Sequence, residues 1–145
     1  MDRVFLDANV LFSAAYREDS GLRRLWDLRD IVLMASYLAV EEARRNLEQA
    51  GRQERLKRLT GAMEIFSCME SEPLPDGVKL PENDRHILQA AIKGRATHLL
   101  SGDRKAYGCY YGRRVSGILI LRPADYLAKR GESQAGRAAN VPHRK

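Results

Sequence analysis

Short unbroken apolar runs alternate along the chain with longer segments in which apolar residues recur at helical spacing. The runs have the length of a strand and are apolar nearly throughout, as expected for parallel strands buried on both faces. They cover residues 3–7, 31–35, 97–101 and 118–121. A fifth segment, 63–69, is predicted as a strand, although its pattern also suits a helix.

Helical spacing and local stop signals predict the segments between these strands. Pro123 suits the first turn of a terminal helix, and Gly94 suits the end of an earlier one. The predicted helices cover residues 9–16, a segment from Ser20 through Trp26, a long segment from Ser36 to about Ala50, a charged segment around Leu56 and Leu59, residues 82–93, and a segment after Pro123. Residues 72–81 contain three prolines and one glycine and are predicted as an extended loop.

The alternation of helices and apolar strands predicts an α/β fold. We expect a three-layer α/β/α sandwich around a mostly parallel central sheet. Residues 1–130 form the expected domain. Residues 131–145 contain almost no large apolar side chain, and we expect a disordered basic tail.

Composition narrows the class of protein. The 145 residues are 44% hydrophobic, which is ordinary for a globular domain. No apolar stretch approaches the ~20 residues of a membrane span, and the first residues do not resemble a signal peptide. We therefore expect a cytoplasmic protein without a membrane partner, in which Cys68 and Cys109 are reduced thiols.

The net charge of +6 indicates a polyanionic partner, and nucleic acid is the leading candidate. Cations are interleaved with tyrosines between residues 104 and 114, a composition that suits unpaired RNA bases and their phosphates. The candidate RNA-binding residues there are Arg104, Lys105, Tyr107, Arg113 and Arg114. A packed loop with ordinary surface charge is the alternative.

Four acidic positions follow predicted strand ends or open predicted helices: Asp7, Glu42, Asp84 and Asp103. Each alone could be a helix cap, a turn residue or part of a solvated face. Ligands of parallel sheets bind outside the carboxyl ends of the strands, so all four can meet in one crevice there. Glu42 is preferred over Glu41 because we place it, with Leu38 and Ala43, toward the apolar stripe of its helix.

Clustered carboxylates repel one another unless a cation lies between them. Mg²⁺ or Mn²⁺ suits oxygen ligands, and such an ion can activate water for attack on a phosphodiester. The acidic positions therefore predict a metal site with hydrolytic chemistry.

With these residues in view, the chain resembles the PIN-domain family of metal-dependent ribonucleases. The resemblance covers residues 3–127 and rests on four motifs in order. They are the segment 4–11 around Asp7 and Asn9, the serine-led helix 36–47 with Glu42, the segment 84–91 that begins at Asp84, and the segment 99–103 with Ser101 and Asp103.

The resemblance implies a three-layer α/β/α fold, bound Mg²⁺ or Mn²⁺, and cleavage of single-stranded RNA by an activated water. It makes Asp7, Glu42, Asp84 and Asp103 the catalytic and metal-site residues, with Asn9 and Ser101 orienting them. Many small family members are toxins of toxin–antitoxin pairs and often dimers, which implies a small antitoxin and a homodimer here. No acid follows Asp103 closely, so the number of metal ions stays open.

Other classes of protein stay open. A receiver domain needs paired acids after its first strand, which the segment Asp7-Ala8-Asn9 does not supply cleanly. A haloacid-dehalogenase-like phosphatase needs a second Asp at the position where this chain has Asn9. A non-catalytic RNA-binding module, or an RNA-processing nuclease without an antitoxin, is the alternative to a toxin. The full set of repelling carboxylates argues against a module that only binds RNA.

Overall fold

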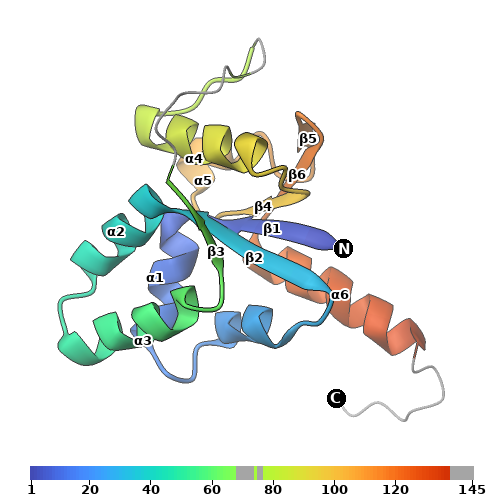
Figure 1. Cartoon of the computed structure of the whole chain (residues 1–145). Coiled ribbons are helices and arrows are strands. Elements are labelled where there is room, and N and C mark those ends of the chain that lie inside the picture. The colour runs from blue at the N-terminus through green and yellow to red at the C-terminus, as the bar shows by residue number, and fades with distance from the viewer. Residues whose placement is uncertain (68–73, 75–76, 138–145) are drawn as a thin grey trace.

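A six-stranded, mostly parallel sheet forms the centre of the molecule (Figure 1). The computed structural model describes residues 1–67, 74 and 77–137. The strand order is β3-β2-β1-β4-β6-β5, and only β5 runs antiparallel to its neighbour. The strands are β1 (Asp2–Leu6), β2 (Ile31–Ser36), β3 (Glu64–Phe66), β4 (His98–Leu100), β5 (Arg114–Val115) and β6 (Ile118–Leu121).

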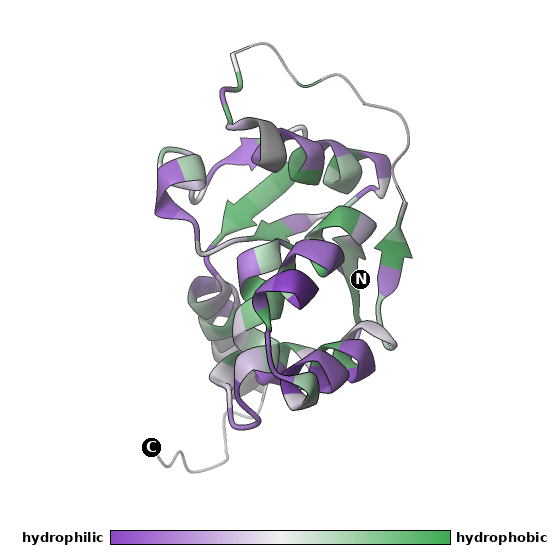
Figure 2. Ribbon diagram, turned by 90° about the vertical axis from the view of Figure 1, so that its left-hand side faces the viewer, coloured by the Kyte–Doolittle hydropathy of each residue, from purple (hydrophilic) through white to green (hydrophobic). Residues whose placement is uncertain are grey.

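Helices cover both faces of the sheet. In Figure 1, α4 lies above the sheet, whereas α1, α3 and α6 lie below it. Figure 2 shows the apolar strands enclosed between helices that carry most of the hydrophilic residues. The helices are α1 (Ala8–Tyr16), the 3₁₀ helix η1 (Gly21–Asp27), α2 (Tyr37–Asn46), α3 (Ala50–Thr60), α4 (Glu82–Lys93), α5 (Arg104–Tyr107) and α6 (Pro123–Arg137).

Burial of consecutive side chains explains the parallel sheet. Val4, Phe5 and Leu6 of β1 are all fully buried, because helices cover both faces of this central strand. In the register, Leu6 pairs with Leu100 of β4, so the carboxyl ends of β1 and β4 lie side by side. The predicted three-layer α/β/α sandwich is confirmed.

A tight hairpin joins β5 to β6 and was not predicted. Ser116 and Gly117 both have positive φ angles, 52° and 79°. A two-residue loop in which both residues have a positive φ angle has a backbone twist that matches the right-handed twist of the flanking antiparallel strands. This turn places Arg114, the last of the candidate RNA-binding residues, in an edge strand of two residues.

The helix predicted from Ser36 to about Ala50 is shorter than expected. It ends at Asn46, and α3 then starts at Ala50. The side chain of Gln53 in α3 donates hydrogen bonds to the carbonyls of Arg44 and Leu47 at 3.2 and 2.7 Å, which satisfies the open end of α2. The helix predicted after Ser20 is a 3₁₀ helix, and the predicted strand 63–69 is shorter, at residues 64–66; residues 68–69 lie outside the described residues.

The terminal helix extends past the expected domain end. Residues 131–137 continue α6, beyond the boundary expected at residue 130. The remaining residues, 138–145, lie outside the part of the chain that the structure describes. No helix within the described ranges is both long and apolar enough to cross a membrane.

Trp26, His98 and Cys109 carry an indole, an imidazole and a thiol, and each lies outside the residues that line the acidic positions. The indole N–H of Trp26 donates to the carbonyl of Leu59 at 2.9 Å and ties η1 to α3. His98, at the amino end of β4, packs edge-on against Tyr126 with ring centroids 5.0 Å apart. Cys109 is a free, exposed thiol, and Cys68 lies outside the described residues.

Candidate active site

Asp7 follows β1 directly and caps the first turn of α1. Its Oδ1 accepts a hydrogen bond from the backbone N–H of Ala8 at 2.7 Å. Its Oδ2 accepts from the hydroxyl of Ser101 at 2.7 Å and from the amide of Asn9 at 3.2 Å. The side chain is 4% exposed, so these donors hold a buried carboxylate in one orientation.

Asn9 and Ser101 connect the end of β1 to the loop after β4. The Asn9 amide oxygen accepts from the backbone N–H of Gly102 at 2.8 Å, and its Nδ2 donates to Ser101 Oγ at 3.3 Å. Ser101 Oγ in turn accepts from the backbone N–H of Asp103 at 3.0 Å. These two side chains, assigned an orienting role from the sequence, therefore contact both Asp7 and the backbone that carries Asp103.

Asp103 caps α5. Its Oδ1 accepts from the backbone N–H groups of Lys105 and Ala106 at 3.0 and 3.1 Å. Asp103 is thus a helix cap, where the sequence left a turn residue open as the alternative to a pocket residue. One carboxylate oxygen anchors the helix, and Asp103 also lines the pocket described next.

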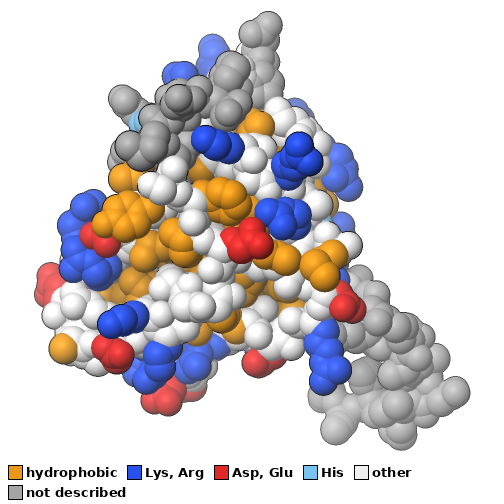
Figure 3. Space-filling model, viewed as in Figure 1, with side chains coloured by type: hydrophobic (Ala, Val, Ile, Leu, Met, Phe, Trp, Pro, Cys, Tyr) orange, Lys and Arg blue, Asp and Glu red, His pale blue; other side chains and the backbone are white. Residues whose placement is uncertain are grey.

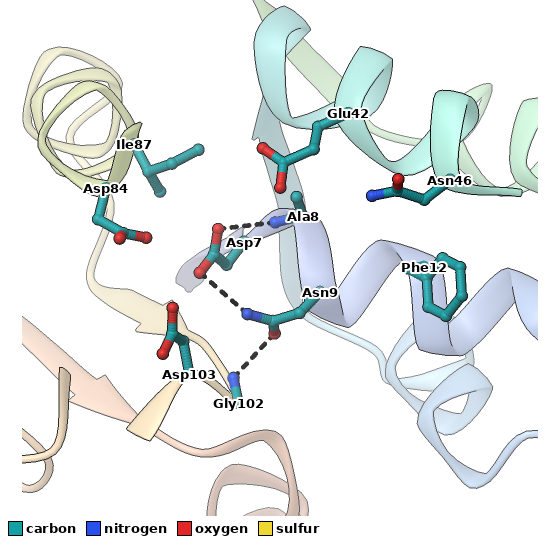
Figure 4. A pocket seen from close by; sticks show the side chains of 10 residues that line it. All are labelled: Asp7, Ala8, Asn9, Phe12, Glu42, Asn46, Asp84, Ile87, Gly102 and Asp103. Carbon is teal, nitrogen blue, oxygen red and sulfur yellow. Dashed lines mark hydrogen bonds between the residues drawn. The ribbon is translucent and has the colours of Figure 1, made fainter. Parts of the chain in front are cut away.

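The four acidic positions come from four elements and line one pocket of about 560 Å³. Figure 4 shows Asp84 and Asp103 on one side of Asp7 and Glu42 above it. Glu42 projects from α2, and Asp84 lies in the first turn of α4. The pocket is lined by Asp7, Ala8, Asn9, Phe12, Glu42, Asn46, Asp84, Ile87, Gly102 and Asp103.

Glu42, rather than Glu41, lies in this pocket. Glu41 instead forms an ion pair with Arg44, with 2.9 Å between Oε1 and Nη2. The buried face of α2 is formed by Ala39 and Ala43, while Leu38 is 56% exposed. The choice of Glu42 thus matches the pocket, but Leu38 does not belong to the buried stripe on which that choice rested.

Burial, together with repulsion between the carboxylates, raises the pKa of two of the acids. Burial raises the pKa of Asp7, and the hydrogen bond from Ser101 opposes this effect. Burial, followed by the charges of the neighbouring carboxylates, raises the pKa of Asp84 to about 6. The pocket therefore carries negative charge that its own donors do not fully offset.

The donor set fits a hard divalent cation. All four candidate ligands are carboxylates, the ligand type that Mg²⁺ prefers. Among the described residues, no three His, Cys, Asp or Glu side chains converge closely enough to bind one ion together. Mg²⁺ usually retains several waters and takes few protein ligands directly, so the open spacing of these acids suits it.

The basic segment divides into exposed cations and a buried tyrosine. Arg104, Lys105, Arg113 and Arg114 are exposed, and the first two lie in α5 directly after Asp103. Tyr107 is 0% exposed, and its hydroxyl donates to the carbonyl of Asp84 at 3.3 Å. The prediction that Tyr107 stacks on RNA bases is therefore wrong, because its ring packs in the core between α5 and α4.

Sequence reasoning missed Phe12 and Asn46 as pocket residues. Asn46 follows Glu42 by four residues on α2, and Phe12 follows Ala8 by four on α1, so one helical turn separates each pair.

Tyr111 was grouped with the RNA-facing aromatics. Its hydroxyl instead donates to the carbonyl of Ser101 at 2.7 Å and supports the loop that carries Asp103.

The charged pocket leads to a prediction about stability. A carboxyl whose folded-state pKa lies above its ordinary value stabilises the fold below pH 4, and this contribution is lost as pH rises through the folded pKa. For Asp84 the window is about pH 4 to 6. In chelator, the unchanged chain should lose stability as pH rises across this window, because Asp84 becomes charged, whereas Asp84→Asn should not. The melting temperature of Asp84→Asn relative to that of the unchanged chain should therefore increase by a few degrees across the window.

Thermal unfolding followed by circular dichroism measures this difference. Mg²⁺ should stabilise the unchanged chain more at pH 7 than at pH 5, because protons compete with the metal for the same oxygens. A melting-temperature difference that does not change between pH 4 and pH 7 would contradict the charge repulsion described above.

Comparison with known proteins agrees with the fold and the order of the motifs. Residues 3–105 match the family model of the PIN domain, a range that includes all four acidic positions. A search of curated proteins gives no match.

Solved structures that are similar to this chain have low sequence identity to it. The crystal structure of VapBC2 from Rickettsia felis, bound to a DNA fragment from its promoter, contains a chain 16% identical to this one with a TM-score of 0.59; the match covers 83% of this chain and 98% of that one. A chain in the FitAcB structure from Neisseria gonorrhoeae is 17% identical, with a TM-score of 0.49 and coverage of 83% and 97%. Since the family model matches well over half of its residues, this chain belongs to the PIN domain family.

Proposed function

We propose that this protein is a metal-dependent endoribonuclease that cleaves single-stranded RNA. PIN domains are generally nucleases, which supports hydrolysis of a phosphodiester. The observation that carries the proposal is the convergence of four carboxylates from four elements on one pocket, in a chain whose net charge is +6. An acidic pocket in a basic protein suits a site that draws in a polyanion and holds a cation at its centre.

Asp7, Glu42, Asp84 and Asp103 would hold Mg²⁺ or Mn²⁺, one or two of them directly and the others through water that the ion retains. When bound, such an ion activates water and offsets negative charge on the phosphate. Asp7 is kept in place by Ser101 and Asn9, so its carboxylate needs little rearrangement to act as a ligand. Asp84, whose pKa is raised to about 6, loses its negative charge below that pH, so cleavage should increase as pH rises through this value.

The exposed cations of the segment 104–114 would bind the RNA backbone. Arg104 and Lys105 lie next to Asp103, and Arg113 and Arg114 follow in the same segment. Each phosphate contact should add about 0.7 to the slope of log affinity against log salt concentration for a single strand. The slope measured for the Arg113→Ala, Arg114→Ala double variant tests this contribution.

The decisive experiment is a cleavage assay on an unstructured, end-labelled single-stranded RNA. We expect internal cleavage with Mg²⁺ or Mn²⁺, and no cleavage in excess chelator. Restoring the metal should restore activity. Cleavage at the same rate in chelator would exclude the metal-dependent mechanism, and binding without cleavage would favour an RNA-binding module.

We further propose that the chain is the toxin of a toxin–antitoxin pair and forms a homodimer. The relative from Rickettsia felis was solved as VapBC2 on promoter DNA, which supports an antitoxin partner. The chain also exposes Tyr37, Leu38 and Ile65, at 53, 56 and 39%. Figure 3 shows hydrophobic side chains gathered on the face that presents β2 and β3. Co-purification with the product of a short neighbouring reading frame tests the antitoxin, and light scattering tests the dimer.

A further inference from the structure

An aromatic pair leads out of the acidic pocket along α1. Phe12 lines the pocket on the side away from Asp84 and Asp103 (Figure 4). The ring centroids of Phe12 and Tyr16 are 5.3 Å apart, with 36° between their planes. Tyr16 lies one helical turn farther along α1 and lines a second cavity of about 470 Å³. The nine residues of α1 span only about 13 Å, so the two cavities are close neighbours.

Arg52 of α3 stacks on Tyr16 in this second cavity. Its guanidinium carbon is 3.7 Å from the centroid of the Tyr16 ring. Within the described part of the chain, no carboxylate lies within ion-pairing distance of Arg52, so its charge is free to meet a phosphate. Tyr16 is 40% exposed, which leaves part of its ring open.

The other charges of the second cavity leave it positive. Arg17 and Asp19 pair with each other at 3.1 Å. Arg55 donates to the carbonyl of Ala15 at 2.8 Å, and its nearest carboxylate, that of the exposed Glu18, lies 3.9 Å away. The buried Nε of Arg55 has no hydrogen-bond partner.

We propose that this second cavity is a subsite for a nucleotide of single-stranded RNA adjacent to the acidic pocket. Aromatic rings and arginine guanidinium planes both stack on unpaired bases, and arginine also pairs with phosphates. In this arrangement Phe12 and Tyr16 guide the strand away from the acids, Tyr16 and Arg52 hold one base, and Arg52 and Arg55 face its phosphate. The inference rests on the proposed function, and it places RNA on the side of the pocket opposite Asp103 and α5.

The test measures RNA binding and RNA cleavage separately. Binding of a short unstructured RNA is followed by fluorescence anisotropy in excess chelator, so that no cleavage occurs, and cleavage is followed with Mg²⁺. The variants are Arg52→Ala, Arg52→Lys and Tyr16→Leu. Arg58→Ala is the matched control, because Arg58 is an exposed cation on the same helix and its removal changes the net charge equally.

We expect Arg52→Ala and Tyr16→Leu to weaken binding about tenfold, which is typical of losing one stacked base. Arg52→Lys should recover only part of the loss, because it retains the charge without the planar stack. The same variants should raise KM more than they lower kcat. RNA containing 4-thiouridine should cross-link on illumination to the peptide that carries Tyr16. Melting curves identify any variant that has lost its fold, and the cross-link on the unchanged chain does not depend on the variants.

The outcomes separate the two ideas. If the unchanged chain binds and cleaves RNA while Arg52→Ala and Tyr16→Leu behave like Arg58→Ala, or if cross-links bypass Tyr16, the subsite is overturned and the nuclease proposal stands. If the unchanged chain neither binds nor cleaves RNA, the proposed function fails together with the subsite.

Discussion

Asp7→Asn is expected to reduce metal-dependent RNA cleavage by roughly a thousandfold or more, with the fold retained. An asparagine keeps the shape of the side chain but removes the charge that would hold the metal, a loss larger than the about 10–100-fold typical of residues that only orient a ligand. The asparagine has a single acceptor oxygen, so it loses either the hydrogen bond from Ala8 at Oδ1 or those from Ser101 and Asn9 at Oδ2. Loss of a buried, repelled charge opposes that cost, so we expect the melting temperature to move by only a few degrees.

Initial cleavage rates on single-stranded RNA with saturating Mg²⁺ measure the effect of Asp7→Asn. Asp27→Asn is the matched control, since Asp27 is an exposed carboxylate at the end of η1. The control should cleave at the rate of the unchanged chain. Near-normal cleavage by a folded Asp7→Asn protein would remove Asp7 from the catalytic centre.

The second prediction with a large effect concerns RNA cleavage after substitution of two adjacent glutamates. Glu42→Gln should lower cleavage by roughly a hundredfold or more, whereas Glu41→Gln should change it less than about twofold. Adjacent helical residues point about 100° apart, and only Glu42 of the two lines the pocket, while Glu41 pairs with Arg44 on the surface. The two variants lose the same charge one residue apart, so each is the control for the other.

Isothermal titration with Mn²⁺ provides a readout that does not depend on turnover. Metal binding should weaken in Glu42→Gln and stay unchanged in Glu41→Gln. The reverse pattern, with Glu41 required and Glu42 dispensable, would place the metal at a different position on α2.

The fold could be predicted because its central strands are recognisable in the sequence as short runs of apolar residues. The run through Val4, Phe5 and Leu6 is apolar at every position, and only a strand covered on both faces buries such a run. The ends of α2 could not be predicted, because a side chain of the next helix, Gln53, terminates it. The β5–β6 hairpin was missed because Ser116 is not a residue that signals a positive φ angle.

The acidic centre was predictable for a similar reason. Parallel strands present their carboxyl ends together, so Asp7 and Asp103 had to approach once the strands were recognised. The surroundings of the tyrosines were not predictable, since interleaved aromatics and cations do not reveal which ring packs inward. Tyr107 is buried, Tyr111 supports the loop after β4, and Tyr16, which carries the proposed subsite, lies outside the basic segment.

The hydrogen bond between Asp7 and Ser101 joins residues 94 positions apart in the chain. It cannot form until β4 has been synthesised and paired with β1, and contacts of such long sequence separation form late because loop closure must precede them. A ribosome must therefore reach Asp103, the last of the four acids in the chain, before the pocket can form. During translation the growing chain first carries Asp7 and Glu42 without their partners from α4 and the loop after β4, so the proposed nuclease activity would not appear before those segments have been synthesised.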